Sequence, residues 1–268
     1  MKVQVNNSEL LQALGHIQSI VEKRTAKSIL SNVKITTQKN KISFYTTDLD
    51  IFAKESINAS VGGQLTTTVP IHIFYEIIRK IGAQKEVQLV FEPSDKPGKM
   101  LIKAGLSEFS LPCLSAEEFP DFEEGKHSCE FEMASSNLHY LIATTKHAIS
   151  YDETRYYLSG VFLHVTEDNG VNVLRAVATD VHRLAIGEVT LPKNAQLLPE
   201  IIIPKKTVFE LAKLLEDFSG EVPIGVSSNK ITFQIGNTTL VSKLIDGKFP
   251  DYHKAVPYGN TKLLEVSI

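Results

Sequence analysis

The chain repeats one pattern of residues, and this internal duplication constrains its fold more than any other feature. Segment 119–122, Phe-Pro-Asp-Phe, recurs at 249–252 as Phe-Pro-Asp-Tyr. Two other pairs recur in the same order: Thr47-Asp48 as Thr179-Asp180, and Val69-Pro70 as Ile203-Pro204. Two copies of one module predict two domains of one fold, whose mutual arrangement contributes to function.

The length and composition are those of an ordinary globular protein with about two domains. The chain has 268 residues, of which 43% are hydrophobic, enough to bury sizeable cores. It has no continuous apolar stretch of ~18 residues, so we expect no transmembrane helix. The N-terminal residues lack the apolar core of a signal peptide, and Cys113 and Cys129 are too few for a disulfide framework. We therefore predict a cytoplasmic protein.

Hydrophobic periodicity predicts an α+β fold with the same element order in both copies. An apolar stripe of helical spacing covers 8–24 and 136–147, and each follows a polar cluster that suits a helix start. A second helix is predicted after each repeated Pro, at 71–82 and 205–216. Strands occupy the rest, so each copy is predicted as β-α-β-β-β-α-β-β-β, with helices on one face of antiparallel sheets.

The predicted domain boundary lies in a polar linker between the copies. This linker divides the chain into domains at 1–123 and 128–257. The tail, 262–268, resembles the opening strand of the module once more. Two interpretations stay open for this tail: the start of a third copy, or a simple C-terminal strand.

The positive charge is concentrated in the predicted helices. The four helix windows contain eight Lys and Arg residues but five Glu residues, whereas the whole chain has a net charge of −3. Ordinary solvated helix faces would explain a small excess of this kind. It is also the distribution expected of helices that face a polyanion while the sheets face solvent.

Sequence motifs for catalysis, metal binding and phosphate binding are absent. The chain has no Gly-rich phosphate loop, no Cys-x-x-Cys, no His-Glu-x-x-His and no Gly-x-Ser-x-Gly. The recurrence of Asp48 and Asp180 indicates an Asp that caps a turn between strands. His182 and Arg183 could form an acid–base pair, but no nucleophile or carboxylate stands at a readable spacing from them. We therefore predict no catalytic residue, no cofactor and no metal.

Three long segments resemble the bacterial DNA polymerase III beta subunit family, the sliding clamps: Arg155–Gly160, Ala178–Ala185 and Ser242–Tyr252. Motifs in the first copy match as well, and the resemblance covers essentially the whole chain. It implies tandem DNA clamp folds in a ring of two head-to-tail subunits. In such a ring the helices line the hole, duplex DNA passes through it, and contacts to phosphates alone permit sliding.

The resemblance also implies two sets of site residues. The DNA side would include Arg24, Tyr156, Tyr157, Lys205 and Lys206, although Tyr157 aligns with Ile29 and has core packing as its alternative role. The peptide-binding pocket would include Leu158, Thr179, His182, Arg183, Leu184 and Pro250. Val181 stands where many relatives have Gly. In the first copy, Asp50-Ile51-Phe52 replaces His182-Arg183-Leu184, so we expect the second copy to receive partners.

The implied partners are double-stranded DNA, the polymerase III alpha subunit and the clamp loader through short peptide motifs, and other polymerases and repair proteins. The family has a third domain, and this chain ends after the strand predicted at 262–268. We therefore expect it not to form the usual closed homodimer. Two alternatives remain: an enzyme with a cleft at the 123–128 border, and an adaptor that binds peptides without encircling DNA.

Overall fold

The computed structural model describes residues 1–23, 27–82, 85–92, 98–121 and 125–256, together with positions 261 and 265. The first copy contains, in order, β1 (Lys2–Asn6), α1 (Asn7–Ile17), the 3-10 helix η1 (Ser28–Ser31), β2 (Asn32–Gln38), β3 (Lys41–Thr47), β4 (Ile51–Asn58), β5 (Ser60–Val61), β6 (Leu65–Pro70), α2 (Ile71–Ile81), β7 (Glu86–Glu92), β8 (Lys99–Ala104) and β9 (Ser107–Pro112). The predicted strand at 262–268 lies outside the described residues, apart from position 265.

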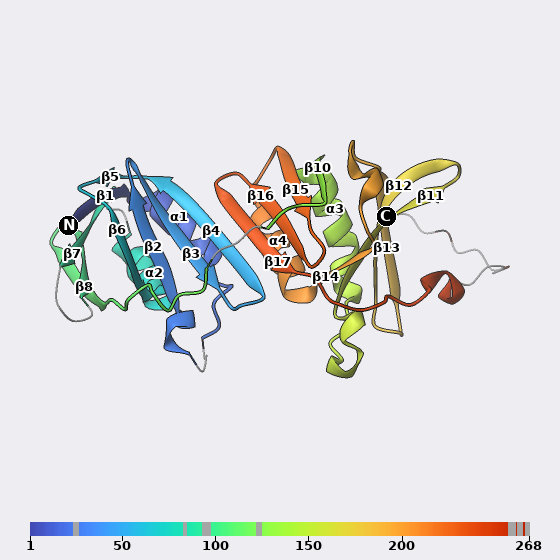
Figure 1. The fold of residues 1–268 in the computed structure, drawn as a ribbon, viewed down its shortest axis with the longest axis horizontal. Coiled ribbons are helices and arrows are strands. Elements are labelled where there is room, and N and C mark those ends of the chain that lie inside the picture. The colour runs from blue at the N-terminus through green and yellow to red at the C-terminus, as the bar shows by residue number, and fades with distance from the viewer. Residues whose placement is uncertain are drawn as a thin grey trace.

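The second copy repeats this arrangement (Figure 1). It contains, in order, β10 (Cys129–Ala134), α3 (Ser135–Thr145), the 3-10 helices η2 (Lys146–Ala148) and η3 (Glu153–Leu158), β11 (Gly160–Asp168), β12 (Val171–Thr179), β13 (Leu184–Thr190), η4 (Ala195–Leu197), β14 (Ile201–Pro204), α4 (Lys205–Glu216), β15 (Glu221–Val226), β16 (Lys230–Ile235), β17 (Thr238–Lys243) and η5 (Tyr252–Ala255).

The α+β class is confirmed, but the predicted element order lacked the two-residue strand β5 of the first copy. It also lacked the strand that precedes the second helix of each copy, which is β6 in the first copy and β14 in the second. Both strands end at the Pro that precedes that helix, and the prediction used this Pro only as a helix signal. β14 has four residues, three of them consecutive isoleucines, so it is too short to show the alternation that identifies a strand.

The first helix of each copy, α1 or α3, begins close to its predicted start and ends before its predicted end. A side chain caps α1, but no described side chain caps α3. The Asn6 side chain accepts hydrogen bonds from the amides of Ser8 (2.9 Å) and Glu9 (3.3 Å) and so caps α1. This helix ends at Ile17, and the buried Ile20 and Val21 pack from the turn that follows. The predicted window, 8–24, was therefore too long, because burial in a turn continues the apolar spacing of the helix.

The described strands form three antiparallel sheets. Their orders are β5-β1-β7-β8-β9, β10-β15-β16-β17-β4-β3-β2-β6, and β13-β12-β11-β14. The eight-stranded sheet crosses the border between the copies, because β17 pairs with β4 over Thr238↔Glu55 to Ser242↔Ile51. The two copies therefore share backbone hydrogen bonds as well as side-chain contacts.

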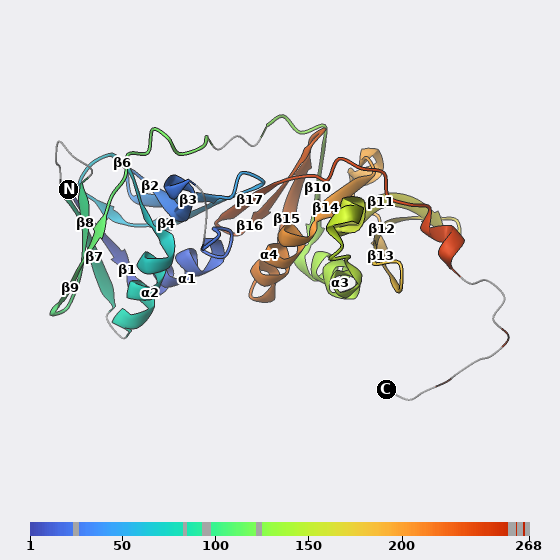
Figure 2. The same ribbon diagram turned by 90° about the horizontal axis from the view of Figure 1, so that it is seen from below.

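The four α-helices lie in a row on one side of the sheets (Figure 2). The described part of the connection between β9 and β10 runs along the other side. Side chains that alternate along each strand pack under the helices, and the rings of Phe44 on β3 and Phe74 on α2 have centroids 6.5 Å apart. In the part of the chain that the structure describes, no helix is long and apolar enough to cross a membrane.

Candidate nucleic-acid face and partner pocket

The repeated Thr-Asp pair forms a tight turn in the second copy, between β12 and β13. The Thr179 hydroxyl accepts from the amide of Val181 (3.0 Å) and donates to the carbonyl of Arg183 (2.7 Å). The Asp180 carboxylate accepts from the amides of His182 and Arg183, both at 3.0 Å. The prediction that this Asp caps a turn is thus confirmed.

The same turn stands in the first copy, between β3 and β4. Asp48 accepts from the amides of Asp50 (3.0 Å) and Ile51 (2.7 Å), and Thr47 donates to the carbonyl of Ile51 (2.8 Å). The two turns even share a left-handed residue, since φ is +82° at Leu49 and +80° at Val181. The recurrence in sequence therefore reflects a recurrence of backbone geometry.

The two Asp residues differ in the partner of the second carboxylate oxygen. In the second copy this oxygen accepts from Nε of Arg183 at 2.9 Å, within the same turn. Desolvation opposes ionisation of Asp180, but the amides of Arg183 and His182 and the Arg183 guanidinium outweigh it and lower the pKa of this carboxyl. The turn therefore presents a fixed, paired charge at the edge of the predicted pocket.

An apolar cluster lies beneath this turn and contains the apolar residues that were predicted for the pocket. Leu158, which is 2% exposed, is buried in it, and Leu184 packs against it from β13. The other buried members are Phe162, Val177, Ile202, Phe249 and Tyr252. The rings of Phe162 and Phe249 stack with centroids 4.8 Å apart and an interplanar angle of 3°.

The structure brings the two kinds of predicted pocket residue to one place. Pro250 is exposed next to the buried Phe249, and the exposed His182 and Arg183 follow from the turn that precedes Leu184. Sequence reasoning had not singled out Phe162, although the comparison of the copies held a signal. Phe162 aligns with Lys34, and a change from Lys to Phe at an equivalent strand position indicates different surfaces.

Two polar side chains contact the hydroxyl of Tyr252 at one side of the apolar cluster. Nη1 of Arg175 donates to this oxygen at 3.0 Å, and Nε2 of His164 lies 3.1 Å from it. His164 also stacks on Phe162 with ring centroids 4.6 Å apart. Burial lowers the pKa of His164, so the ring is held in its neutral form.

The predicted DNA residues of the second copy are divided between two environments. Tyr156 is 55% exposed, whereas Tyr157 packs against the Leu158 cluster, as its alternative role in the core required. The two rings meet edge to face, with centroids 5.7 Å apart. Lys205 begins α4, and its ammonium lies 3.8 Å from the centroid of the Tyr151 ring. Arg24 lies outside the described residues.

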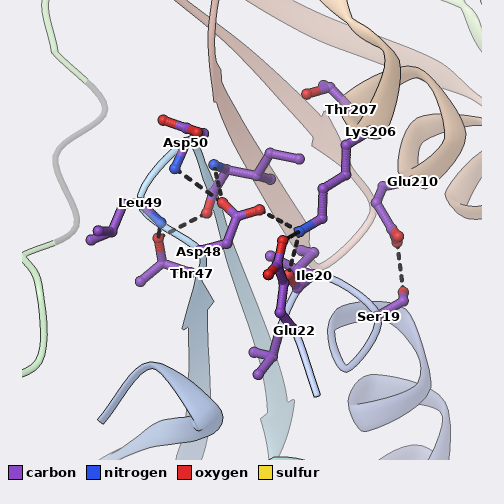
Figure 3. A network of polar contacts seen from close by, with 12 residues as sticks. Ser19, Ile20, Glu22, Thr47, Asp48, Leu49, Asp50, Lys206, Thr207 and Glu210 are labelled. Atoms are coloured by element: carbon purple, nitrogen blue, oxygen red, sulfur yellow. Dashed lines mark hydrogen bonds and ion pairs between the residues drawn. The ribbon is translucent and has the colours of Figure 1, made fainter. Parts of the chain in front are cut away.

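Lys206 joins the two copies (Figure 3). Its ammonium donates to the Ile20 carbonyl (2.9 Å) and to the Asp48 carboxylate, and lies 3.6 Å from Oε1 of Glu22. Asp48 thus uses its second oxygen for a contact between copies, where Asp180 pairs within its own turn. Sequence reasoning had assigned Lys206 to DNA alone, because nothing in the sequence places α4 beside the 15–22 segment.

Two further contacts connect α4 to the end of α1. The Ser19 hydroxyl donates to Glu210 at 2.7 Å, and the Lys213 ammonium donates to the Gly15 carbonyl and to Ser19, both at 2.8 Å. These contacts hold the row of helices together at the border between the copies. Elsewhere in the described ranges, no group of three His, Cys, Asp or Glu side chains could hold a metal ion.

The residues weighed for an enzymatic cleft are only partly described. Glu123 and Glu124 lie outside the described residues, and Lys126 is exposed. His127 lies 3.0 Å from a carboxylate oxygen of Glu130 and 3.2 Å from the Thr232 hydroxyl. His182, whose backbone amide donates to the Asp180 carboxylate in the turn, is exposed.

Comparison with known proteins relates both copies to one family. Residues 1–123 match the model of the DNA polymerase III beta subunit, N-terminal domain, and residues 132–251 match that of its central domain. The chain is 41% identical to the beta sliding clamp of Caulobacter vibrioides over 266 residues, which are 98% of this chain and 70% of that protein. It is 36% identical to the beta sliding clamp of Pseudomonas aeruginosa over 267 residues, again 98% and 70%.

Solved structures agree with this relationship. The crystal structure of the C. crescentus beta sliding clamp superposes with a TM-score of 0.93 at 40% identity, covering 98% of this chain and 69% of that one. A sliding clamp from Bartonella birtlesii, bound to griselimycin, superposes with a TM-score of 0.91 at 38% identity, covering 97% and 69%. The chain therefore spans about 70% of the length of these relatives.

Proposed function

This chain belongs to the DNA polymerase III beta subunit family, the sliding clamps of DNA replication, and we propose which of its residues contact DNA and which bind partner proteins. The helix row contacts duplex DNA, and the Leu158 cluster with its turn binds short peptides of partner proteins. The role is non-catalytic: the clamp tethers the polymerase to DNA and leaves the chemistry to its partner.

The proposed DNA face is the row of α-helices together with the segments that follow α1 and α3. The windows 8–24, 71–82, 136–147 and 205–216 carry eight Lys and Arg residues against five Glu, whereas the four helices by themselves carry five against four. Lys205 stands at the start of α4, where the helix dipole adds to its positive charge. Tyr156 is exposed on η3, and we assign it to the same face with Arg24 and Lys206 as further members. Contacts of this kind reach phosphates and not base edges, so they hold the duplex weakly at every position.

The proposed partner pocket takes an apolar peptide. Leu158 and Leu184 provide apolar surface, Pro250 adds an exposed apolar edge, and His182 and Arg183 provide polar contacts at the rim. Thr179 shapes the site through the turn. The observation that carries this proposal is the row Phe162, Val177 and Ile186 across three paired strands, which is apolar only in the second copy.

A labelled peptide of sequence Gln-Leu-Asp-Leu-Phe tests the pocket by fluorescence anisotropy. We expect Leu158→Ala and Arg183→Ala each to weaken binding by about tenfold, the loss typical of a central contact. The matched control is Leu30→Ala, because Leu30 is the buried equivalent of Leu158 in the first copy. Unchanged affinity in both pocket variants, or an equal loss in the control, would contradict the assignment.

We also propose the wider organisation that the family suggests. The domains extend over 1–123 and 128–257, and the polymerase III alpha subunit, the clamp loader and other polymerases and repair proteins share the pocket. The protein acts in the cytoplasm, where chromosomal DNA is replicated, and its family assembles as a ring-shaped homodimer. Mass measurement of the native protein in solution tests the last point.

A further inference from the structure

A row of two lysines and one tyrosine crosses three adjacent strands of the first copy. In the sheet register Lys34 on β2 pairs with Tyr45 on β3, and Tyr45 pairs with Lys54 on β4. The ammonium groups of Lys34 and Lys54 lie 6.0 and 5.9 Å from the centroid of the Tyr45 ring. Lys34 also lies 5.7 Å from the centroid of the Phe119 ring. The row thus combines two cations with aromatic surface.

This row lies on the side of the sheet that faces away from the helices. Phe44 meets Phe74 of α2, and the next residue along the strand, Tyr45, points to the opposite side. Lys34, Tyr45 and Phe119 line a groove there, and Lys54, Thr36, Pro120 and Asp121 complete its lining. The strands β2, β3 and β4 that carry it stand side by side in Figure 1. The groove is therefore separate from the proposed DNA face.

The groove occupies the place in the first copy that the peptide pocket occupies in the second. Lys34, Tyr45 and Lys54 take the positions of Phe162, Val177 and Ile186 in the same cross-strand row. Phe119 of the repeated Phe-Pro-Asp segment takes the position of Phe249. In this cross-strand row the first copy therefore carries two lysines and a tyrosine, whereas the second copy carries three apolar side chains.

We propose that this groove binds an acidic segment of a partner protein. Carboxylates of the segment pair with Lys34 and Lys54, and an apolar side chain of the segment packs on Phe119 and Pro120. Among the described residues neither ammonium forms an ion pair, and both side chains are half-buried. A partner carboxylate would therefore meet two ammonium groups that have no carboxylate partner among the described residues, on a surface shielded in part from water.

A peptide fits the groove better than a nucleic acid does. Two cations neutralise two carboxylates, whereas binding of a polyanion requires a longer run of Lys and Arg. The lining includes the apolar surface of Phe119 and Pro120, which suits an apolar side chain that a phosphate backbone does not offer, and the carboxylate of Asp121 limits the number of anionic groups that the groove accepts. The groove thus selects a short segment with a few acidic residues around one apolar residue.

The test uses the full chain and a fluorescein-labelled peptide of sequence Asp-Glu-Phe-Glu-Asp. We expect saturable binding that weakens with salt, and a loss of about tenfold in the double variant Lys34→Gln/Lys54→Gln. The matched control is Lys41→Gln/Lys85→Gln, which removes two exposed lysines of the same copy and the same net charge. The variant Lys34→Arg/Lys54→Arg should retain binding, because it keeps both charges.

Three results would overturn the proposal: no saturable binding to the unmodified chain, an equal loss in the control pair, or tighter binding of an oligonucleotide in the same groove. Thermal unfolding of each variant verifies that it is folded. The site is also independent of the proposed partner pocket. Leu158→Ala should leave the acidic peptide bound, and Gln-Leu-Asp-Leu-Phe should not displace it, so failure at one site is distinguishable from failure at the other.

Discussion

The Lys206 ammonium of the second copy donates to the Asp48 carboxylate of the first. Asp48 is at the same time the cap of the turn between β3 and β4. The side chain of Asp48 is 13% exposed and that of Lys206 is 35% exposed, so the pair is shielded in part from water. One carboxylate therefore both orders a turn and connects two domains.

This pair should contribute measurably to stability. We expect Asp48→Asn and Lys206→Met each to lower the free energy of unfolding by about 1–2 kcal/mol, since each leaves a partly buried group without its charged partner. A double-mutant cycle from urea denaturation should give a coupling of about 1 kcal/mol. Lys243 and Asp50 form the control pair between the same copies at 3.0 Å, because they are 51% and 74% exposed. Their coupling should stay below about 0.5 kcal/mol.

The left-handed backbone conformation of Val181 indicates that a substitution at this position would stabilise the protein. A β-branched residue with a φ of +80° costs about 1–3 kcal/mol, whereas Gly costs about 0.4–1 kcal/mol through the unfolded chain. Val181 is 59% exposed, so its removal sacrifices little packing. Val181→Gly should therefore raise the free energy of unfolding by about 1 kcal/mol. Val171→Gly, at an equally exposed strand position, should lower it.

The neutral His164 predicts a loss of stability in acid. Burial lowers its folded-state pKa below the unfolded value, so the unfolded chain binds more protons as the pH falls below that value. The contribution of neutral His164 to the free energy of unfolding is complete above about pH 6.5 and is lost as the pH falls toward the folded-state pKa. The free energy of unfolding then falls with a slope of at most about 1.4 kcal/mol per pH unit. Chemical denaturation between about pH 7.5 and about pH 5.5 measures this slope. It should be shallower in His164→Gln, and an unchanged slope would contradict the assignment.

The proposed DNA face predicts a change in salt dependence. Lys205→Gln should weaken binding of duplex DNA at low salt and reduce the slope of log affinity against log salt by about one, as expected for one lost phosphate contact. Lys126→Gln removes an exposed lysine of the connection on the other side of the sheets and serves as the control. Equal slopes for the two variants would mean that the helix row does not contact phosphates.

Much of the module was predictable because its signals are local. The helices at 71–81 and 205–216 follow a Pro and carry an apolar stripe, and the Thr-Asp turns are made by side chains that bond to amides two and three residues away. The strands β6 and β14 were not predicted, because what identifies them is their pairing with β2 and β11 in the sheet and not an alternation of apolar and polar residues along their own sequences.

The duplication, the α+β class, the turn chemistry and the family could all be predicted from the amino-acid sequence, since each depends on residues close together in the chain or on recurrence along it. The contacts of Lys206, Tyr157 and Lys34 became known only from the folded structure. Lys206 meets Asp48 because β17 pairs with β4, and Lys34 meets Tyr45 because β2 pairs with β3. Such contacts depend on which strands become neighbours, and that is settled by the packing of the whole chain.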